Sequence, residues 1–251
     1  MSDFKVVIPA RLSSTRLPGK PLLEIAGKPM IVHVCERALE SGGEVLVATE
    51  DESIVDAVRH LNVRALMTRR DHASGTERLF EVAEIMGWPG KTRIINLQGD
   101  EPLMDPALIP RLANALDQDL VATLSAPIRS ATELFDPNVV KVVCNALGHA
   151  VYFSRAPIPW HRDHFSHSQA TLPEILLHQR HVGIYAYRID FLNRYAAWSR
   201  SPLEEAEALE QLRILWHGEK IRVILLEEAP EGGVDTLEDL QRVRDRWSQS
   251  G

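Results

Sequence analysis

The sequence predicts an α/β fold with a mostly parallel sheet flanked by helices and a smaller antiparallel addition. Three observations predict it. Apolar strand-like runs alternate with amphipathic helical segments over the first half of the chain. The first of these runs, at 6–8, is apolar at every position, as in a strand buried on both faces. Beyond about residue 139 the alternation gives way to consecutive strands.

The predicted elements of the first half follow one another as strand, helix, strand, helix and strand, which indicates right-handed crossovers. Apolar periodicity predicts strands at 6–8, 45–48, 63–67, 93–97 and 121–128. It predicts helices opening at 28–30 and ending at 42–43, then at 54–61, about 79–86 and 105–116. Pro9 is expected to end the first strand, because proline offers no backbone donor.

The second half is predicted to hold antiparallel strands at 139–144, 150–154 and 181–188, a strong helix at 203–217, a strand at 221–226 and a last helix from 237 to about 247. Residues 155–180 show no periodicity and are interpreted as a functional flap over the site. His161, His164 and His167 in this segment raise the alternative of a zinc site, but no helical context there would fix its geometry.

Composition narrows the classes of function. The chain has 251 residues, enough for one α/β domain with a sizeable core, and a net charge of −7. An acidic chain without a basic stripe is not expected to bind nucleic acid. No apolar run is long enough to span a membrane and no signal peptide opens the sequence, so a cytoplasmic protein is expected. Cys35 and Cys144 are interpreted as small buried hydrophobes.

The loop that follows the first strand carries three cations, Arg11, Arg16 and Lys20. In open α/β sheets ligands bind beyond the carboxyl ends of the strands, so this loop is placed to hold a polyanion such as a triphosphate. A cation about 4 Å from a phosphate charge is worth on the order of 4 kcal/mol at an effective dielectric near 20. The loop is not a Walker A motif, and a merely solvated surface loop is the alternative.

Acidic residues follow two other predicted elements. Asp100 comes just after the strand at 93–97, where a carboxylate suits Mg²⁺, although an Asp there is also a common turn residue. Asp235 precedes the last helix and is either a second such carboxylate or the helix N-cap. Earlier in the chain than either of them, Ser74 and Gly75 open a helix whose free N–H groups suit an anionic or carbonyl ligand, with a simple capped loop as the alternative.

Eight segments in order resemble one family, the 3-deoxy-manno-octulosonate (Kdo) cytidylyltransferases. They are PARLSSTRLPGKP, HASGTER, LQGDEP, NVVKVV, YFSRAPIPW, RHVGIYAYR, PLE with LEQLR, and GVDT. Departures are small. Leu12 stands where the family often has an aromatic residue, Glu50 where Asp is usual, and Leu237 where Pro commonly follows Asp-Thr.

The resemblance implies a Rossmann-like nucleotidyltransferase fold in a single domain over 1–251. It implies a nucleotide-binding core at 1–130, a sugar-acid-binding and dimerisation embellishment at about 139–190, and a return to the core at 203–251. The reaction implied is transfer of CMP from CTP to the anomeric hydroxyl of Kdo, releasing pyrophosphate, for lipopolysaccharide biosynthesis. Mg²⁺ as cofactor and a homodimer are implied as well.

Site residues are assigned by the same resemblance. The catalytic set is Arg11, Arg16, Lys20, Asp100 and Asp235. The nucleotide-binding set is Pro9, Ala10, Arg11, Lys20, Ser74 and Gly75. Magnesium is assigned to Asp100 and Asp235. The sugar-binding set is Arg78, Gln98, Arg155, His181, Tyr185, Glu210 and Gln211.

Three other functions compete. A CMP-sialic acid synthetase shares the type of first loop, but the PLE…LEQLR and YFSRAPIPW segments argue against it. A catalytically inactive nucleotide-binding regulator would be expected to lose Lys20 or a metal carboxylate, and these are present. A nucleotide-sugar glycosyltransferase would be expected to carry Asp-x-Asp, whereas Asp100 is followed by Glu101 and Pro102.

Overall fold

The computed structural model describes residues 3–13, 17–72, 74–175 and 177–250. The chain divides into two compact units, each assembled from separate stretches of sequence. The first unit comprises Met1–Asn114, Ile184–Ala196 and Glu231–Gly251, and the second comprises Ala115–Gly183 and Ala197–Pro230.

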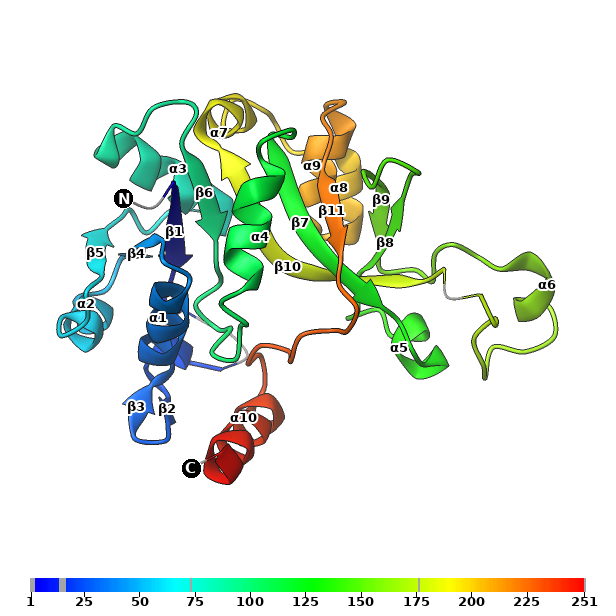
Figure 1. The fold of residues 1–251 in the computed structure, drawn as a ribbon, viewed down its shortest axis with the longest axis horizontal. Helices are drawn as coiled ribbons and strands as arrows, with labels where there is room; N and C mark the ends of the chain where they lie inside the picture. The colour runs from blue at the N-terminus through cyan, green and yellow to red at the C-terminus, as the bar shows by residue number, and fades with distance from the viewer. Residues whose placement is uncertain (1–2, 14–16, 73, 176, 251) are drawn as a thin grey trace. The chain divides into compact units, whose positions relative to one another are not determined.

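The first unit is built on a mostly parallel sheet with β1 (Phe4–Pro9) at its centre (Figure 1). Parallel to it run β4 (Glu44–Thr49) and β6 (Arg93–Asn96), with β5 (Arg64–Met67) beyond β4. The end of β10 (Gln179–Arg188) lies antiparallel to β6. The mostly parallel sheet predicted from the apolar runs is confirmed. The apolar residues of β1, β4 and β6 are buried, whereas β5 at the edge is partly exposed.

Helices surround this sheet. They are α1 (Met30–Glu40), α2 (Glu52–Val58), α3 (Gly75–Met86), α4 (Leu108–Ala115), α7 (Ile189–Tyr195) and α10 (Leu237–Ser250), preceded by the short helix η1 (Lys20–Leu22) and the hairpin of β2 (Glu24–Ile25) and β3 (Lys28–Pro29). Their apolar sides form buried clusters such as that of Leu17, Met30, Val234 and Leu240. This cluster joins the segment after β1 to the last helix.

The first strand ends at Pro9, as predicted, although Pro9 itself still belongs to the strand. It pairs with Ala48 of β4, and Ala10 N donates to Ala48 O at 2.9 Å. Val7 O accepts from Leu97 N, so the backbone polar groups of Val7 face β6. The backbone polar groups of every second residue face the same neighbouring strand, so the nitrogen of Pro9, which carries no hydrogen, also faces β6. Because β6 ends at Asn96, no ladder bond is lost there.

The second unit holds both parallel and antiparallel strand pairs. β7 (Val121–Pro127) and β11 (Arg222–Leu225) are parallel, whereas β8 (Lys141–Cys144) is antiparallel to β9 (Ala150–Ser154) and to the start of β10. The antiparallel additions predicted from the consecutive strands are therefore confirmed. Its helices are α5 (Ala131–Phe135), α6 (Arg162–Phe165), α8 (Pro202–Glu207) and α9 (Gln211–Trp216).

The single helix predicted over 203–217 is wrong. Ala208 adopts a left-handed conformation, with φ of 51°, and separates α8 from α9. Glu204, expected on a solvated face, is 7% exposed and forms two hydrogen bonds to Arg213 across the break, at 2.6 and 2.8 Å. Apolar spacing continues through residue 208, so periodicity alone cannot reveal the break.

Residues 155–180 contain more structure than their composition predicts. Phe165 of α6 is buried with Ile128 and Leu134. Two of the three histidines donate ring N–H groups to backbone carbonyls, since His164 Nε2 lies 2.9 Å from Thr171 O and His167 Nδ1 lies 2.7 Å from Asp163 O. These rings therefore hold the local turns of the segment.

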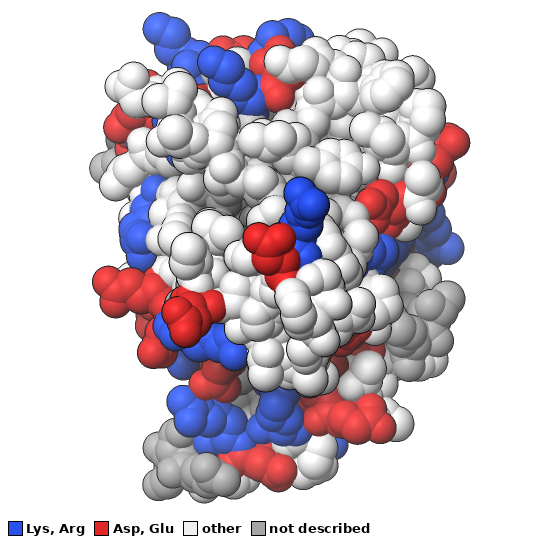
Figure 2. Space-filling view, turned by 90° about the vertical axis from the view of Figure 1, so that its right-hand side faces the viewer, with Lys and Arg blue, Asp and Glu red and all other residues white. Residues whose placement is uncertain are grey.

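Surface charge follows the acidic composition. On the face drawn in Figure 2, basic and acidic side chains are interspersed, and the atoms coloured there gather into no continuous basic stripe. Of the helices in the described ranges, none is both long enough and apolar enough to cross a lipid bilayer. Cys35 is buried in α1, where burial raises the pKa of its thiol to about 12, and Cys144 is half-buried.

Removing the charge of Glu204 is expected to destabilise the protein. Glu204→Gln leaves the guanidinium of Arg213 buried without its counter-ion, so we expect the free energy of unfolding to fall by about 3 kcal/mol. Urea denaturation measures the change. Glu205→Gln, on the exposed side of the same helix, is the matched control and should change it by less than about 0.5 kcal/mol. Equal effects from both variants would contradict a structural role for the buried pair.

Candidate active site

A cavity of about 500 Å³ opens in the first unit where β1 and β6 end and α3 begins. Its lining contains every described residue of the predicted nucleotide-binding and catalytic sets, with several others. The lining residues are Pro9, Ala10, Arg11, Ser13, Lys20, Pro21, His72, Ser74, Gly75, Arg78, Gln98, Gly99, Asp100 and Asp235. Arg16, predicted to belong to the same loop, lies outside the described residues.

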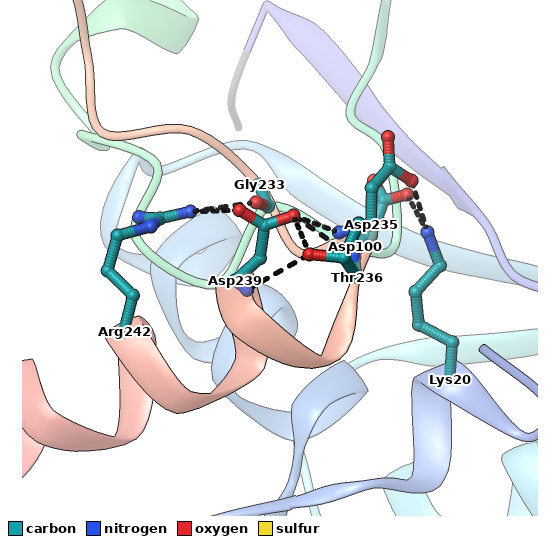
Figure 3. Close-up of polar contacts among 7 residues, drawn as sticks. All are labelled: Lys20, Asp100, Gly233, Asp235, Thr236, Asp239 and Arg242. Atoms are coloured by element: carbon teal, nitrogen blue, oxygen red, sulfur yellow. Dashed lines mark hydrogen bonds and ion pairs between the residues drawn. The ribbon is translucent and has the colours of Figure 1, made fainter. Parts of the chain in front are cut away.

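Lys20 links two carboxylates that are far apart in the sequence (Figure 3). Its Nζ lies 2.6 Å from Asp100 Oδ2 and 2.9 Å from Asp235 Oδ1. The side chain of Lys20 is only 13% exposed, whereas that of Asp235 is 49% exposed. Burial lowers the pKa of Lys20, but the charge of Asp100 and the hydrogen bonds to both carboxylates outweigh it and leave the pKa above its ordinary value.

The two carboxylates meet because the loop before α10 packs against the turn after β6. Val234 N donates to Asp100 O at 2.9 Å. A Cβ at Gly233 would lie 2.8 Å from that same oxygen, so only glycine allows the approach. Gly99 likewise allows the turn after β6 to approach the end of β1, since a Cβ there would lie 3.0 Å from Pro9 O.

Thr236, and not Asp235, is the N-cap of α10. Asp239 N donates to Thr236 Oγ1 at 3.2 Å, and Asp239 Oδ2 accepts in return from Thr236 N at 3.0 Å and from Asp235 N at 3.1 Å (Figure 3). The alternative that Asp235 serves as the cap is therefore wrong. With the cap provided by its neighbours, the carboxylate of Asp235 is left to pair with Lys20.

The start of α3 forms another wall. Ser74 is the N-cap, and its Oγ accepts from Glu77 N at 3.3 Å, so this segment is a capped loop as well as part of the cavity lining. Gly75 packs closely, because a Cβ there would lie 3.4 Å from the ring of Pro9. Backbone N–H groups at this helix start are therefore near the loop that follows β1.

Sequence reasoning did not assign His72, although it lies in the HASGTER segment. It lines the cavity and its Nε2 pairs with Glu81, which also accepts from Arg69 N. Burial raises the pKa of Glu81, but the hydrogen bonds from His72 and Arg69 together lower it by more, so the pKa is below its ordinary value. The sequence signal that could have identified it is the position of a histidine two residues before the N-cap of α3.

The predicted sugar-binding residues are divided between the two units. Arg78 and Gln98 line the cavity, and the guanidinium of Arg78 is buried against Glu50, 2.6 Å from Nη2 to Oε2, and against the Thr68 hydroxyl. Tyr185, also in the first unit, is buried in β10 and its ring stacks on that of Tyr187.

The other four lie in the second unit. Arg155 follows β9, and His181, in β10, has its Nε2 3.1 Å from Thr123 Oγ1. Burial, assisted by the nearby charge of Arg180, lowers the pKa of His181 to about 3, so its ring is neutral at physiological pH. Glu210 and Gln211 stand at the start of α9.

The residues present fit a divalent cation. Asp100 and Asp235 offer hard carboxylate oxygens, and both point at one Lys20 ammonium, so the structure already places a positive charge between them. Within the described ranges no cluster of three or more His, Cys, Asp or Glu residues suits a metal ion. Two carboxylates match Mg²⁺, which usually takes one or two from the protein and completes its shell with phosphate and water.

Comparison with known proteins agrees with the fold. Residues 5–221 match a family model described as cytidylyltransferase, so the chain is a nucleotidyltransferase of that family. The chain is 56% identical over 247 residues to a 3-deoxy-manno-octulosonate cytidylyltransferase of Methylococcus capsulatus, covering 97% of this chain and 96% of that protein. Within its family the chain belongs to the 3-deoxy-manno-octulosonate cytidylyltransferases.

Solved structures agree at two levels of similarity. The structure of a CMP:2-keto-3-deoxy-manno-octonic acid synthetase complexed with CTP is 45% identical, with a TM-score of 0.90 and full coverage of both chains. A cytidylyltransferase from Leptospira borgpetersenii is 17% identical, with a TM-score of 0.64, over 99% of this chain and 88% of that one. The second likeness shows the fold alone.

Neutralising Asp239 is expected to loosen the loop that presents Asp235, with a characteristic pH dependence. Burial raises the pKa of Asp239, but hydrogen bonds from Arg242, Asp235 and Thr236 lower it, and the net shift is downward. A carboxyl whose folded-state pKa is lowered stabilises the fold above its unfolded pKa, and this stability is lost as the pH falls through the folded value.

Asp239→Asn should therefore lower the free energy of unfolding by about 1 kcal/mol at pH 7, the worth of a typical cap. The difference from wild type should shrink below about pH 4, near the unfolded pKa of Asp. Chemical denaturation at a series of pH values measures it. A difference that stays constant down to pH 2 would show that the Asp239 charge contributes nothing.

Proposed function

We propose that this chain transfers CMP from CTP to the anomeric hydroxyl of Kdo, giving CMP-Kdo and pyrophosphate. The observation that supports the proposal most directly is the convergence of Lys20, Asp100 and Asp235 on one cavity beside the loop after β1. The 56% identity to an enzyme named for this substrate and the likeness to a structure complexed with CTP support it further.

The reaction needs no protein nucleophile. The anomeric oxygen of Kdo attacks the α-phosphorus of CTP, the bond from that phosphorus to the bridging oxygen breaks, and pyrophosphate leaves while the hydroxyl proton is released. Positioning and charge neutralisation do most of the work in such transfers. Arg11 and Lys20 line the cavity and would neutralise the triphosphate and the departing pyrophosphate, and Arg16 is assigned the same role.

Asp100 and Asp235 would hold Mg²⁺, which supplies charge neutralisation at the phosphates and lowers the pKa of a bound hydroxyl. In the structure the ammonium of Lys20 stands between these carboxylates. Lys20 would therefore exchange the carboxylates for phosphate oxygens when the nucleotide binds. Pro9, Ala10, Ser74 and Gly75 would contact the base and ribose.

The sugar acid brings a carboxylate and several hydroxyls of its own. We assign Arg155, His181 and Tyr185 to the carboxylate end and Gln98, Glu210 and Gln211 to the hydroxyls, with Arg78 nearby. Arginine suits this role because its planar guanidinium forms paired hydrogen bonds with a carboxylate.

The setting of the enzyme is proposed on family resemblance alone. The chain would act in the cytoplasm, as a homodimer, in lipopolysaccharide biosynthesis, with residues 139–190 contributing to the dimer contact and neither nucleic acid nor a membrane as partner.

Loss of one metal carboxylate should strongly reduce turnover. Magnesium-dependent pyrophosphate release from CTP is measured with Kdo, without Kdo, and with sialic acid or other nucleoside triphosphates in place of the substrates. We expect release only with CTP and Kdo together, and a fall of at least about 10²-fold in kcat for Asp100→Asn and Asp235→Asn, because transition-state charge is then poorly neutralised.

Asp105→Asn is the matched control, since Asp105 is exposed and its carboxylate caps a local turn through Ala107 N. It should leave kcat within about twofold of wild type. Pyrophosphate release with sialic acid in place of Kdo would show that sialic acid, and not Kdo, is the sugar-acid substrate. Binding of CTP without turnover would favour a regulator.

Removing the Lys20 ammonium should have opposite effects on the metal and on the nucleotide. Lys20→Met deletes the cation that competes with a metal for the two carboxylates, so without CTP the affinity for Mn²⁺ should rise at least about tenfold. KM for CTP should also rise, because the triphosphate loses a cationic partner. Electron paramagnetic resonance measures free Mn²⁺ directly. Lys28→Met removes the same charge from the exposed pair with Glu36 and is the control. Unchanged Mn²⁺ affinity in Lys20→Met would contradict a shared site.

A further inference from the structure

Glu207 holds the short segment Ser154–Arg155 with three hydrogen bonds, all within the second unit. Its carboxylate accepts from Ser154 Oγ at 2.6 Å and from Arg155 N at 2.9 Å. Its backbone carbonyl accepts from Arg155 Nε at 2.8 Å. One residue thus fixes both the backbone and the side chain of Arg155.

The helix break explains how the carbonyl of Glu207 reaches Arg155. In a continuous helix this oxygen would accept from the N–H four residues on, at position 211. Glu207 is instead the last residue of α8, and the left-handed Ala208 turns the chain. The carbonyl is one of the orphan acceptors of a helix end, and Arg155 Nε satisfies it. Glu204 and Arg213 hold the break in place.

A second anchor acts from the other side of Arg155. Its Nη1 donates to Pro137 O at 3.0 Å. The ammonium of Lys141, which is fully buried, donates to Asp136 O, Val139 O and Arg155 O at 2.9, 2.6 and 2.6 Å. The 136–139 turn and the backbone of Arg155 are therefore tied to the same buried cation.

These bonds leave part of the guanidinium available. An arginine has five N–H donors, and the two of Nη2 make no hydrogen bond within the described part of the chain, nor does the second N–H of Nη1. A carboxylate accepts paired bonds from two parallel N–H groups on neighbouring nitrogens. The Nη1–Nη2 end of Arg155 keeps three N–H groups for a carboxylate, and its orientation is set in advance by Nε.

We propose that Glu207 is a positioning residue for the sugar acid: it fixes Arg155 so that the Nη1–Nη2 end of the guanidinium receives the carboxylate of Kdo. The inference rests on the proposed function, in which Arg155 binds that carboxylate. Fixing the arginine before the substrate arrives removes the rotamer entropy that binding would otherwise cost. Glu207 touches neither substrate in this role and acts through Arg155.

The test is a double-mutant cycle on KM for Kdo. Glu207→Gln keeps the shape but removes the charge, so the charge-assisted bonds to Ser154 Oγ and Arg155 N become weaker bonds to a neutral amide. We expect KM for Kdo to rise about tenfold, the equivalent of one hydrogen bond to a charged group, with kcat and KM for CTP within about twofold of wild type. In an Arg155→Lys background, where Nε and the fork are gone, Glu207→Gln should add no further change.

Two further variants complete the test. Ser154→Ala removes one partner of the Glu207 carboxylate and should raise KM for Kdo in the same direction but less, and it serves if Glu207→Gln folds poorly. Glu205→Gln, exposed two residues earlier in α8, is the control and should leave both KM values unchanged.

The outcomes separate this inference from the proposed function. The positioning role would be overturned if Glu207→Gln raised KM for CTP as much as KM for Kdo. It would also be overturned if Glu207→Gln raised KM for Kdo equally in the wild-type and Arg155→Lys backgrounds. Neither result would affect the proposed function, which depends on turnover by the wild-type protein. Absence of turnover by the wild-type protein with CTP and Kdo would overturn the proposed function itself.

Discussion

The shared ion pair of Lys20 with Asp100 and Asp235 is the constraint on which the candidate active site depends. Its partners are 80 and 215 residues from Lys20 along the chain, so the site exists only when the start, middle and end of the sequence are folded together. Backbone contacts prepare this meeting. The bond from Val234 N to Asp100 O and the close approach at Gly233 fix the two acidic turns before any charge interaction is considered.

Two like charges brought together in this way require a cation. In the structure Lys20 provides it, and its limited exposure makes the attraction stronger than it would be in water. The same requirement can be met by a divalent ion, which releases the lysine for an anionic partner. Charge balance at one point therefore links the metal, the nucleotide and the first loop in a single account.

The second unit illustrates a different use of backbone geometry. The left-handed Ala208 interrupts what looks like one amphipathic helix and exposes the carbonyl of Glu207 to Arg155. The buried pair of Glu204 and Arg213 spans the break. Three acidic residues at spacing three, Glu204, Glu207 and Glu210, thus lie in different environments, although their pattern is typical of one solvated helix face.

The sequence predicts well what depends on local pattern. Continuous apolar runs located β1, β4 and β6, and the rule that ligands bind at the carboxyl ends of parallel strands placed Lys20 and Asp100 together. It could not distinguish two roles for Asp235, because an Asp before a helix is equally good as a cap. That choice depends on Asp239, whose carboxylate reaches back to Thr236 N only in the folded loop.

Other features depend on tertiary contacts that no local pattern encodes. The break at Ala208 is visible in neither the propensity of alanine nor the apolar spacing. The pairing of Arg78 with Glu50 joins residues from separate segments, and it neutralises a cation that the sequence would count as available to a ligand.

A crystal structure with Mg²⁺ and an unreactive CTP analogue tests the central claim most directly. The account predicts that Asp100 and Asp235 ligate the metal, and that Lys20 Nζ leaves both carboxylates to contact a phosphate of the nucleotide. A nucleotide bound in this cavity with Lys20 still between the two carboxylates, and the metal held elsewhere, would contradict it.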